Sequence, residues 1–404
     1  MRKGINLKLN FSKDFYNKND LMISITIMSS YAVLAAQFFV LHLFNLSGTG
    51  QGSLVQIISK VVVGILFIIT LPTIIKRNLL TFVCVYFIAV FILLINLVFF
   101  PQNSEELLGV AFSLLFICLP CLIYSFSLND NKILLAVIYK ISNIVLILGM
   151  IIAILVLTKE IVLEDYSMAL SYYLLLPTIV NMYRFIAEKS YISILKVIIS
   201  LLIILMLGSR GPLLCFGIYS ILAILKNNNK ITLNTLLFYT SSAFSLLLGV
   251  IFFESIILKI NDLLIRYGIF SRTLYLFIEE ENIHLSGRNE IYQIITSHIY
   301  ENPLLGIGIA GDRQVMGTYS HNIFIELLSG FGIIFGSLII LLIAWISLKG
   351  IFNKNKLDSN ISIMLFSLGF IPLLVSGSYL TEFIFWIFLG ITIKGLYNRK
   401  KISK

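Results

Sequence analysis

Three side chains stand out because their type and position suit them to chemistry on an anionic substrate. Arg210 stands in the segment 208–212 between two apolar runs. Placing an arginine at or near the depth of the hydrocarbon costs free energy, so such a residue is a candidate for a function. Arg288 opens a predicted helix, whose free N–H groups and fixed guanidinium favour a phosphate group. His321 precedes another predicted helix, where the positive end of the helix dipole keeps an imidazole neutral and able to act as a general base.

Each of the three also has a plainer explanation. Arg210 can extend along the membrane interface, Arg288 can be a solvated surface arginine, and His321 can be a capping or packing residue. The case for function therefore depends on the three together.

Other candidate motifs give weaker signals. Residues 306–311 match G-x-G-x-x-G, but no βαβ unit surrounds them, so they predict a turn that lets the backbone approach a ligand. His42 and His298 are expected to pack, and His284 lies in an acidic stretch that is typical of solvated surface. The sequence has no Walker loop, zinc motif or pair of glycosidase carboxylates, so we expect no cofactor and no metal.

The elements that must position these residues follow from composition. The 404 residues are 58% hydrophobic and 12% charged, with a mean hydropathy of +0.97. This excludes a soluble, a disordered or a disulfide-stapled protein, and apolar runs of about 20 residues predict membrane-spanning helices. The fold class is an all-α polytopic membrane protein, a single integral membrane domain over 1–404. The expected spans, about twelve, are 22–43, 53–75, 79–100, 107–128, 133–157, 166–184, 191–208, 212–225, 232–253, 322–348, 360–378 and 380–397.

Charge orients these spans. Of the 30 Lys and Arg residues, 20 fall on the side that holds both termini, seven fall on the other side and three lie within spans. The positive-inside rule therefore predicts cytoplasmic N- and C-termini. The net charge of +10 reflects this topology and contact with anionic membrane lipid, not nucleic-acid binding.

One long segment, 254–320, is predicted as a large outward loop between the ninth and tenth spans. Within it, residues 287–300 carry apolar side chains at 291, 294, 295 and 299, the spacing of an amphipathic helix lying on the outer face of the membrane. Asn302-Pro303 is expected to end this helix. Long ordered loops are usually functional.

Several segments on this predicted outer face together resemble the O-antigen polymerase and ligase family, which includes capsule repeat-unit polymerases. They are Ser209-Arg210-Gly211, Gly287-Arg288, 302–308, 321–326 and Phe331-Gly332. The resemblance in motif detail covers roughly 205–340. It implies a type C glycosyltransferase with about twelve spans and a large periplasmic loop, which moves glycan from an undecaprenyl-pyrophosphate carrier without nucleotide sugar or metal.

The resemblance implies roles for particular residues. Arg210 and Arg288 would hold the donor pyrophosphate, and His321 would be the catalytic base. Arg313, Arg272 and Asn322 would contact acceptor or phosphate. Many relatives carry an acidic residue two positions before the glycine that Gly332 matches, and here that position is Gly330, so the part played by Glu326 stays open, as does that of Lys60.

The compact stretch 306–321 is more similar to the repeat-unit polymerases than to the ligases. The expected function is polymerisation of undecaprenyl-pyrophosphate-linked repeat units on the outer face of the bacterial inner membrane. Both donor and acceptor would then be carrier-linked glycans, and the resemblance leaves room for a chain-length regulator protein as a partner. The alternative is an O-antigen ligase, which would transfer glycan to lipid A–core.

Other classes are a polysaccharide flippase or transporter, a scaffold and a sensor. Transporters bind substrate at the midplane between matched repeats, whereas here the conspicuous polar residues gather outside and no two halves match. A scaffold predicts that Arg210, Arg288 and His321 tolerate alanine. A sensor needs an output domain, for which the sequence gives no sign.

Overall fold

The computed structural model describes residues 17–44, 46, 48–158, 168–207, 209–227, 253–266 and 288–402. Across these ranges the regular structure is helical, with no strand, as the apolar runs predict. Six of the described helical stretches are long and apolar enough to cross a membrane, which supports a multi-pass all-α membrane protein. They are Lys18–Leu43, Gly50–Phe99, Pro101–Phe126, Asn131–Val156, Ile323–Ile351 and Lys356–Leu374, with shorter apolar helices at Tyr191–Met206, Gly211–Lys226 and Phe383–Tyr397. The total of about twelve spans stays a prediction, and the expected span 232–253 lies outside the described residues.

The chain divides into two compact units. Unit 1 comprises residues 1–8, 31–59 and 139–284, and unit 2 comprises 9–30, 60–138 and 285–404. Three helices, α1 (Lys18–Leu43), α2 (Gly50–Phe99) and α5 (Asn131–Leu157), contribute residues to both.

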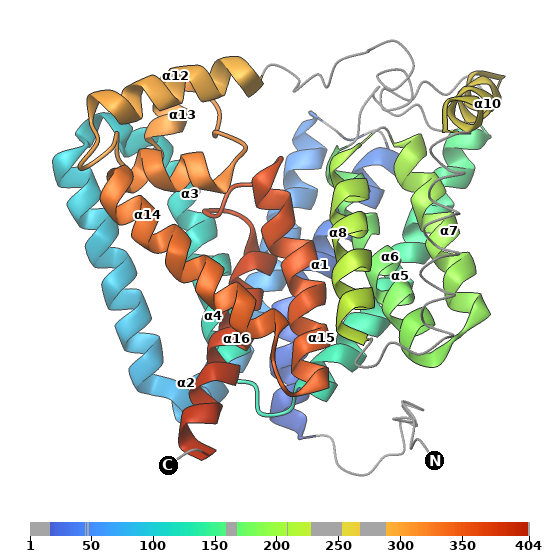
Figure 1. The fold of residues 1–404 in the computed structure, drawn as a ribbon, viewed down its shortest axis with the longest axis horizontal. Coiled ribbons are helices and arrows are strands. Elements are labelled where there is room, and N and C mark those ends of the chain that lie inside the picture. The colour runs from blue at the N-terminus through green and yellow to red at the C-terminus, as the bar shows by residue number, and fades with distance from the viewer. Residues whose placement is uncertain are drawn as a thin grey trace. The chain divides into compact units, whose positions relative to one another are not determined.

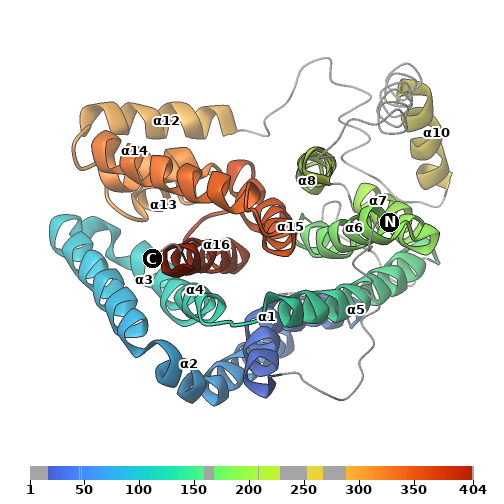
Figure 2. The ribbon, with the colours of Figure 1, turned by 60° about the horizontal axis from the view of Figure 1, so that its bottom comes forward.

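In unit 1, α6 (Met168–Glu188) packs against α7 (Tyr191–Met206) and α8 (Gly211–Asn227), as Figure 2 shows. The unit also contains α10 (Phe253–Arg266). Its buried core is aliphatic and includes Ile152, Leu174, Ile204 and Leu207. Aliphatic packing of this kind joins helices that hydrophobicity alone does not hold together in lipid.

Pro177 lies inside α6 and has no N–H with which to bond the carbonyl of Tyr173. The hydroxyl of Tyr31, on α1, donates to the carbonyl oxygens of Tyr172 and Tyr173, each at 2.9 Å. A polar group that the proline leaves without a helical partner is thereby satisfied inside unit 1.

In unit 2, α2 changes direction at Asn78, whose φ of −147° and ψ of 48° are not helical. The sequence places a break between spans at 75–79, and the structure has it there. Arg77 pairs with Asp20 of α1, and the Asn78 amide donates to the Ser127 hydroxyl at 2.8 Å. Polar contacts thus fix the bend. In the most apolar stretch of α2 only 11% of the residues are buried, which suits a helix that faces lipid.

The next residues form one continuous helical stretch. It comprises η1 (Pro101–Asn103), α3 (Ser104–Ser113), the π-helix η2 (Leu114–Cys118) and α4 (Leu119–Phe126). α4 packs closely against α16 (Phe383–Ile402), the last helix of the chain. Cys118 and Cys121 are free and buried there, as small apolar side chains.

The helix α14 (Ile323–Ile351) has two parts that meet at Gly332, where φ is 74° and ψ is 173°. Before Gly332 the helix is buried and carries polar residues, among them Glu326 and Ser329. After it, large apolar side chains such as Phe335 and Trp345 are exposed, as expected of a lipid-facing helix. The chain continues with α15 (Lys356–Leu365), the π-helix η3 (Phe366–Phe370) and the 3₁₀ helix η4 (Ile371–Leu374).

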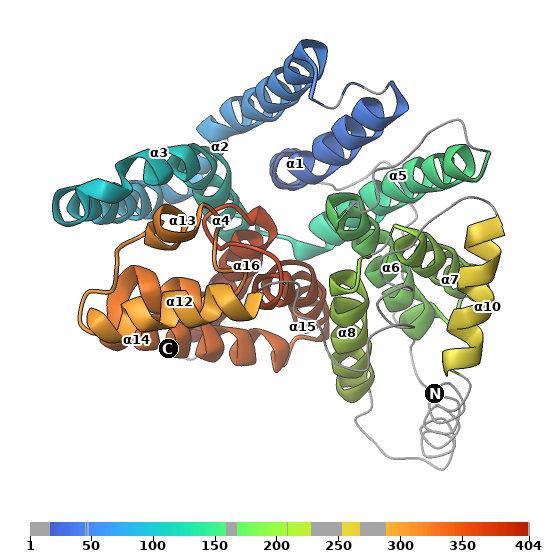
Figure 3. The same ribbon diagram turned by 90° about the horizontal axis from the view of Figure 1, so that it is seen from above.

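Besides α10 of unit 1, two described helices of the predicted outward loop belong to unit 2. α12 (Arg288–Glu301) matches the amphipathic helix expected at 287–300 and ends before Asn302-Pro303. Its Ile295 and Ile299 are buried, and the helix packs against α14, with the short α13 (Gly311–Met316) nearby (Figures 1 and 3). The apolar face of α12 is therefore covered at least in part by protein, not only by the membrane surface as the sequence suggested.

Candidate functional site

His321 lies directly before α14, at the turn that leads into the helix. Its backbone is in the left-handed region, with φ of 55°, which is uncommon for a residue with a side chain. The helix begins at Ile323, and Asn322 is its N-cap, with the Asn322 side-chain oxygen accepting from the N–H groups of Phe324 (2.9 Å) and Ile325 (3.5 Å). The predicted place of His321 at a helix N-terminus is confirmed.

Unit 2 brings Arg288 and His321 into one electrostatic environment. Burial of the ring, followed by the positive charge of Arg288, lowers the pKa of His321 below its ordinary 6.5. A lowered pKa leaves the imidazole neutral at neutral pH, the form that accepts a proton. The Nδ1 atom of His321 is buried and has no hydrogen-bond partner among the described residues.

Tyr319 lies against His321, with the two ring centroids 4.1 Å apart. Its hydroxyl donates to the carbonyl of Ser376 at 2.7 Å, which connects the turn to the segment between η4 and α16. Burial raises the pKa of Tyr319, so this phenol stays protonated and can donate.

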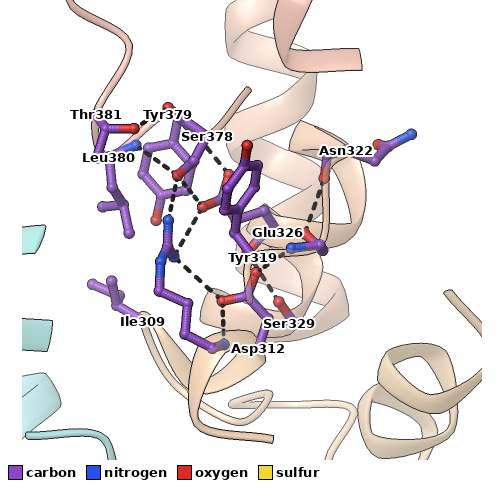
Figure 4. A network of polar contacts seen from close by, with 12 residues as sticks. Ile309, Asp312, Tyr319, Asn322, Glu326, Ser329, Ser378, Tyr379, Leu380 and Thr381 are labelled. Carbon is purple, nitrogen blue, oxygen red and sulfur yellow. Dashed lines mark hydrogen bonds and ion pairs between the residues drawn. The ribbon is translucent and has the colours of Figure 1, made fainter. Parts of the chain in front are cut away.

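A buried polar network lies beside this turn, and Figure 4 shows it from close by. The Arg313 guanidinium donates to Asp312 (3.4 Å), Glu326 (3.3 Å) and Ser378 (2.7 Å). The carboxylate of Glu326 also accepts from the Ser378 hydroxyl and from the N–H of Tyr379 (3.2 Å). The network therefore ties α13, α14 and the segment 375–382 together.

Arg313 and Glu326 are 7% and 3% exposed, so the guanidinium is enclosed by protein partners. The expected contact between Arg313 and substrate stays a prediction, but the geometry favours a role in holding the turn. For Glu326, whose part the sequence left open, the structure gives a definite set of partners. An unpaired charge this deeply buried would be costly.

The glycine-rich segment 306–311 packs its backbone against α14 and α2. Gly306 and Gly308 have φ of 69° and 84°. The N–H of Ile307 donates to the Ser329 carbonyl at 2.7 Å, and Asn96 of α2 accepts from the N–H of Ile309 at 2.7 Å. The glycines therefore allow one backbone to approach another, where the sequence suggested approach to a ligand.

Arg210 belongs to unit 1, where it lies directly before α8. The N–H of Leu214 donates to the Arg210 carbonyl at 3.2 Å, so the guanidinium side chain leaves the chain at the positive end of that helix. A Cβ added at Gly211 would lie 2.0 Å from the hydroxyl oxygen of Tyr172, so glycine leaves room for this phenol beside Arg210. This local setting suits an anion.

The remaining predicted residues divide simply. Asn322 caps α14, as above, and its amide also donates to the Leu374 carbonyl at 3.5 Å. Arg272 lies outside the described residues. Lys60 is exposed on α2. Among the described residues no group of three or more His, Cys, Asp or Glu side chains is placed to hold a metal ion.

Sequence reasoning did not assign roles to Asp312, Tyr319, Ser376 or Ser378. The first two lie in segments that carry the family resemblance, so a signal was present. The two serines follow an apolar run in which small polar residues have no informative spacing. Only the return of the chain between η4 and α16 brings them to the turn.

What the arrangement offers chemically is an imidazole with a lowered pKa, within electrostatic reach of a guanidinium, on the turn directly before α14. No curated protein matches the chain in sequence. Residues 195–341 match the sequence model of the O-antigen ligase family. This segment contains Arg210, Arg288 and His321 and coincides closely with the segment 205–340 that carries the predicted resemblance. The match confirms that resemblance: over residues 195–341 the chain is similar to the O-antigen ligase family, consistent with the O-antigen polymerase and ligase family.

Proposed function

We propose that the protein polymerises undecaprenyl-pyrophosphate-linked oligosaccharide repeat units into O-antigen or capsule polysaccharide, on the outer face of the bacterial inner membrane. The family match supports O-antigen polymerase or ligase activity in general. The observation that carries the proposal is the placement of Arg288 within electrostatic reach of His321, a half-buried imidazole whose pKa is lowered.

In the proposed reaction a hydroxyl oxygen of the acceptor glycan forms a bond to the anomeric carbon of the donor. The bond from that carbon to the carrier phosphate breaks, and undecaprenyl pyrophosphate leaves with the electron pair. His321 takes the proton of the attacking hydroxyl. Arg210 and Arg288 hold the pyrophosphate, whose negative charge grows as the bond breaks, so they stabilise the transition state more than the ground state. The place of Arg210 in this proposal rests on its sequence motif and on its setting at the start of α8.

A ligase is the second candidate, because the matching family model is described as an O-antigen ligase. The chemistry at the donor would be the same, and only the acceptor would differ. A polymerase transfers glycan to another carrier-linked glycan, whereas a ligase transfers it to lipid A–core. The compact stretch between Gly306 and His321 favours the polymerase.

The test is the surface-glycan ladder of a null strain that is complemented with the wild-type gene, His321→Ala or a matched control, His298→Ala. His298 lies near the end of α12, where its side chain is 36% exposed and pairs with Glu301 at 3.2 Å. Loss of a general base costs roughly 100- to 10,000-fold in rate. We therefore expect His321→Ala to abolish the ladder and His298→Ala to leave it intact.

The form of the loss separates the candidates. Single repeat units on lipid A–core, with no longer bands, support the polymerase. Full-length polymer that stays on the carrier lipid and never reaches the core supports the ligase instead. A normal ladder with His321→Ala, at wild-type protein level in the membrane, contradicts the catalytic role of His321.

A further inference from the structure

We propose that Asp312 is a positioning residue for His321, and that Arg313, Glu326 and Ser378 serve to anchor Asp312. The inference deepens the proposed function and rests on it for the chemical role of His321. It gives Arg313 a part in holding the base, in place of the expected contact with substrate.

Asp312 contacts the backbone of the turn that carries His321. One oxygen of the Asp312 carboxylate, Oδ2, accepts the N–H of Ser320 at 2.8 Å. Ser320 directly precedes His321, whose φ of 55° lies in the left-handed region that residues with a side chain adopt less readily than glycine. A strained backbone persists only where the surrounding structure stabilises it. The hydrogen bond from the Ser320 N–H to the Asp312 carboxylate is one such stabilising contact.

The Asp312 carboxylate is itself held by Arg313. Its other oxygen, Oδ1, accepts from the N–H of Arg313 at 3.0 Å and from the Arg313 guanidinium at 3.4 Å. That guanidinium is in turn bound by Glu326 on α14 and by Ser378 (Figure 4). Asp312 is 1% exposed, so its carboxylate has a fixed orientation and little access to water.

The ring of His321 also has a neighbour that is bound to the network. It lies against Tyr319, which bonds Ser376 and also lies beneath the Arg313 guanidinium, 5.5 Å from the ring centroid. The same network therefore contacts the turn at two places, the N–H of Ser320 and the ring of Tyr319. Moving a catalytic group by about 1 Å can cost about 100-fold in rate, so such holding matters for the chemistry.

Charge gives the proposal a measurable sign. Burial, Arg288 on α12 and Arg313 on α13 lower the pKa of His321, whereas a backbone hydrogen bond with Ser376 and the charge of Asp312 on α13 raise it. Glu326 on α14 and Glu382 before α16 act on the neighbouring Tyr319. Neutralising Asp312 should lower the midpoint at which His321 titrates, whereas loosening the fold should move it up toward the value of an exposed histidine.

The experiment uses the full chain in lipid nanodiscs with isotope-labelled histidine, and follows the His321 ring by NMR as the pH is changed. The His321 signal is the one that disappears in His321→Gln. Asp312→Asn keeps an oxygen that can accept the Ser320 N–H but removes the charge, so we expect the midpoint of the His321 titration to fall. Asp312→Ala removes both, so the ring should be released and its midpoint should rise.

Unit 2 supplies a matched control. Asp20 is also fully buried and also holds an arginine, Arg77, together with the backbone N–H groups of Asn129 and Asp130. Asp20→Asn and Asp20→Ala therefore remove an equivalent set of contacts without touching the His321 turn. We expect both to leave the His321 titration unchanged.

An unchanged His321 titration in both Asp312 variants overturns the proposal, and so does an equal shift in the Asp20 variants. If Asp312→Ala does not fold, Ser378→Ala removes a single hydroxyl from the anchor, and an unchanged titration in it and in Asp312→Asn overturns the proposal as well. The readout is independent of glycan synthesis. If the Asp312 variants shift the His321 titration but the strain with His321→Ala makes a normal ladder, the positioning role is supported and the proposed function is contradicted.

Discussion

At the scale of single residues, the site depends on how polar groups are satisfied around one turn. Asn322 illustrates the point, because the sequence suggests a contact with substrate and the structure gives its side-chain oxygen to the first turn of α14. The two roles use different atoms. Capping uses the oxygen Oδ1, whereas a donor to substrate phosphate would be the amide nitrogen Nδ2.

This difference yields a prediction for Asn322. Asn322→Asp keeps an oxygen that can cap the helix and adds a negative charge at the positive end of its dipole. Asn322→Ala loses the cap and should lower the free energy of unfolding by about 1 kcal/mol. We expect the Asp variant to retain both thermal stability and glycan synthesis, and the Ala variant to lose stability. Thermal denaturation of the purified chain, measured beside the glycan ladder, checks this. A stable Asp variant with no ladder would show that the amide contacts substrate.

At the scale of elements, two glycines lock α14 to the segment that carries Asp312. A Cβ at Gly332 would lie 2.2 Å from the Leu304 carbonyl oxygen, and one at Gly306 would lie 2.1 Å from that of Ser329. Both glycines have positive φ, and both neighbourhoods are bridged by backbone hydrogen bonds, from Ile333 to Pro303 and from Ile307 to Ser329. Only glycine allows this approach of two backbones.

We therefore expect Gly332→Ala and Gly306→Ala each to destabilise the protein. The left-handed backbone alone costs roughly 1–2 kcal/mol for a residue with a Cβ, and the contact with a carbonyl adds to it. Gly109→Ala, on α3 in the same unit, is the matched control, because a Cβ there has nothing within 4 Å and alanine favours a helix. The fraction of chain that stays monodisperse after heating should fall in the first two variants and not in the third. Equal behaviour of all three would remove the lock as an explanation.

The bounds of the helices show which parts of the fold can be predicted from the sequence. Apolar runs place α1, α5 and α14 within a few residues of their predicted ends, and apolar spacing finds α12. Hydropathy does not register φ, so it misses the break at Gly332 inside an unbroken apolar run. It also predicts one span over 360–378, where the structure ends α15 at Leu365 and continues as a π-helix and a 3₁₀ helix around Pro372. The two serines that complete the site lie just beyond these irregular turns.

At the scale of the whole molecule, the charge distribution makes a prediction about orientation. Residues 288–322 carry the candidate site. A second region carries Lys349 in the last turn of α14, Lys354 in the loop after it and Lys356 at the start of α15. The two regions lie at opposite ends of α14, whose part after Gly332, residues 333–351, spans about 28 Å, close to the hydrocarbon thickness of a bilayer. The positive-inside rule places the lysines in the cytoplasm and the site outside. A donor linked to a carrier lipid would then meet His321 on the outer face.

Single cysteines in a background without the four native ones test this orientation. Ser297 is exposed on α12, and Lys354 is exposed in the loop after α14. In intact spheroplasts a membrane-impermeant maleimide should label Ser297→Cys, and it should label Lys354→Cys only after the membrane is permeabilised. Labelling in the opposite pattern would place the site in the cytoplasm and exclude a reaction at the outer face. The predicted orientation follows from 20 Lys and Arg residues on the inner side against seven on the outer side. Extra arginines beside Ser297 reduce this difference, so they should lower the fraction of Ser297→Cys protein that is labelled in intact spheroplasts.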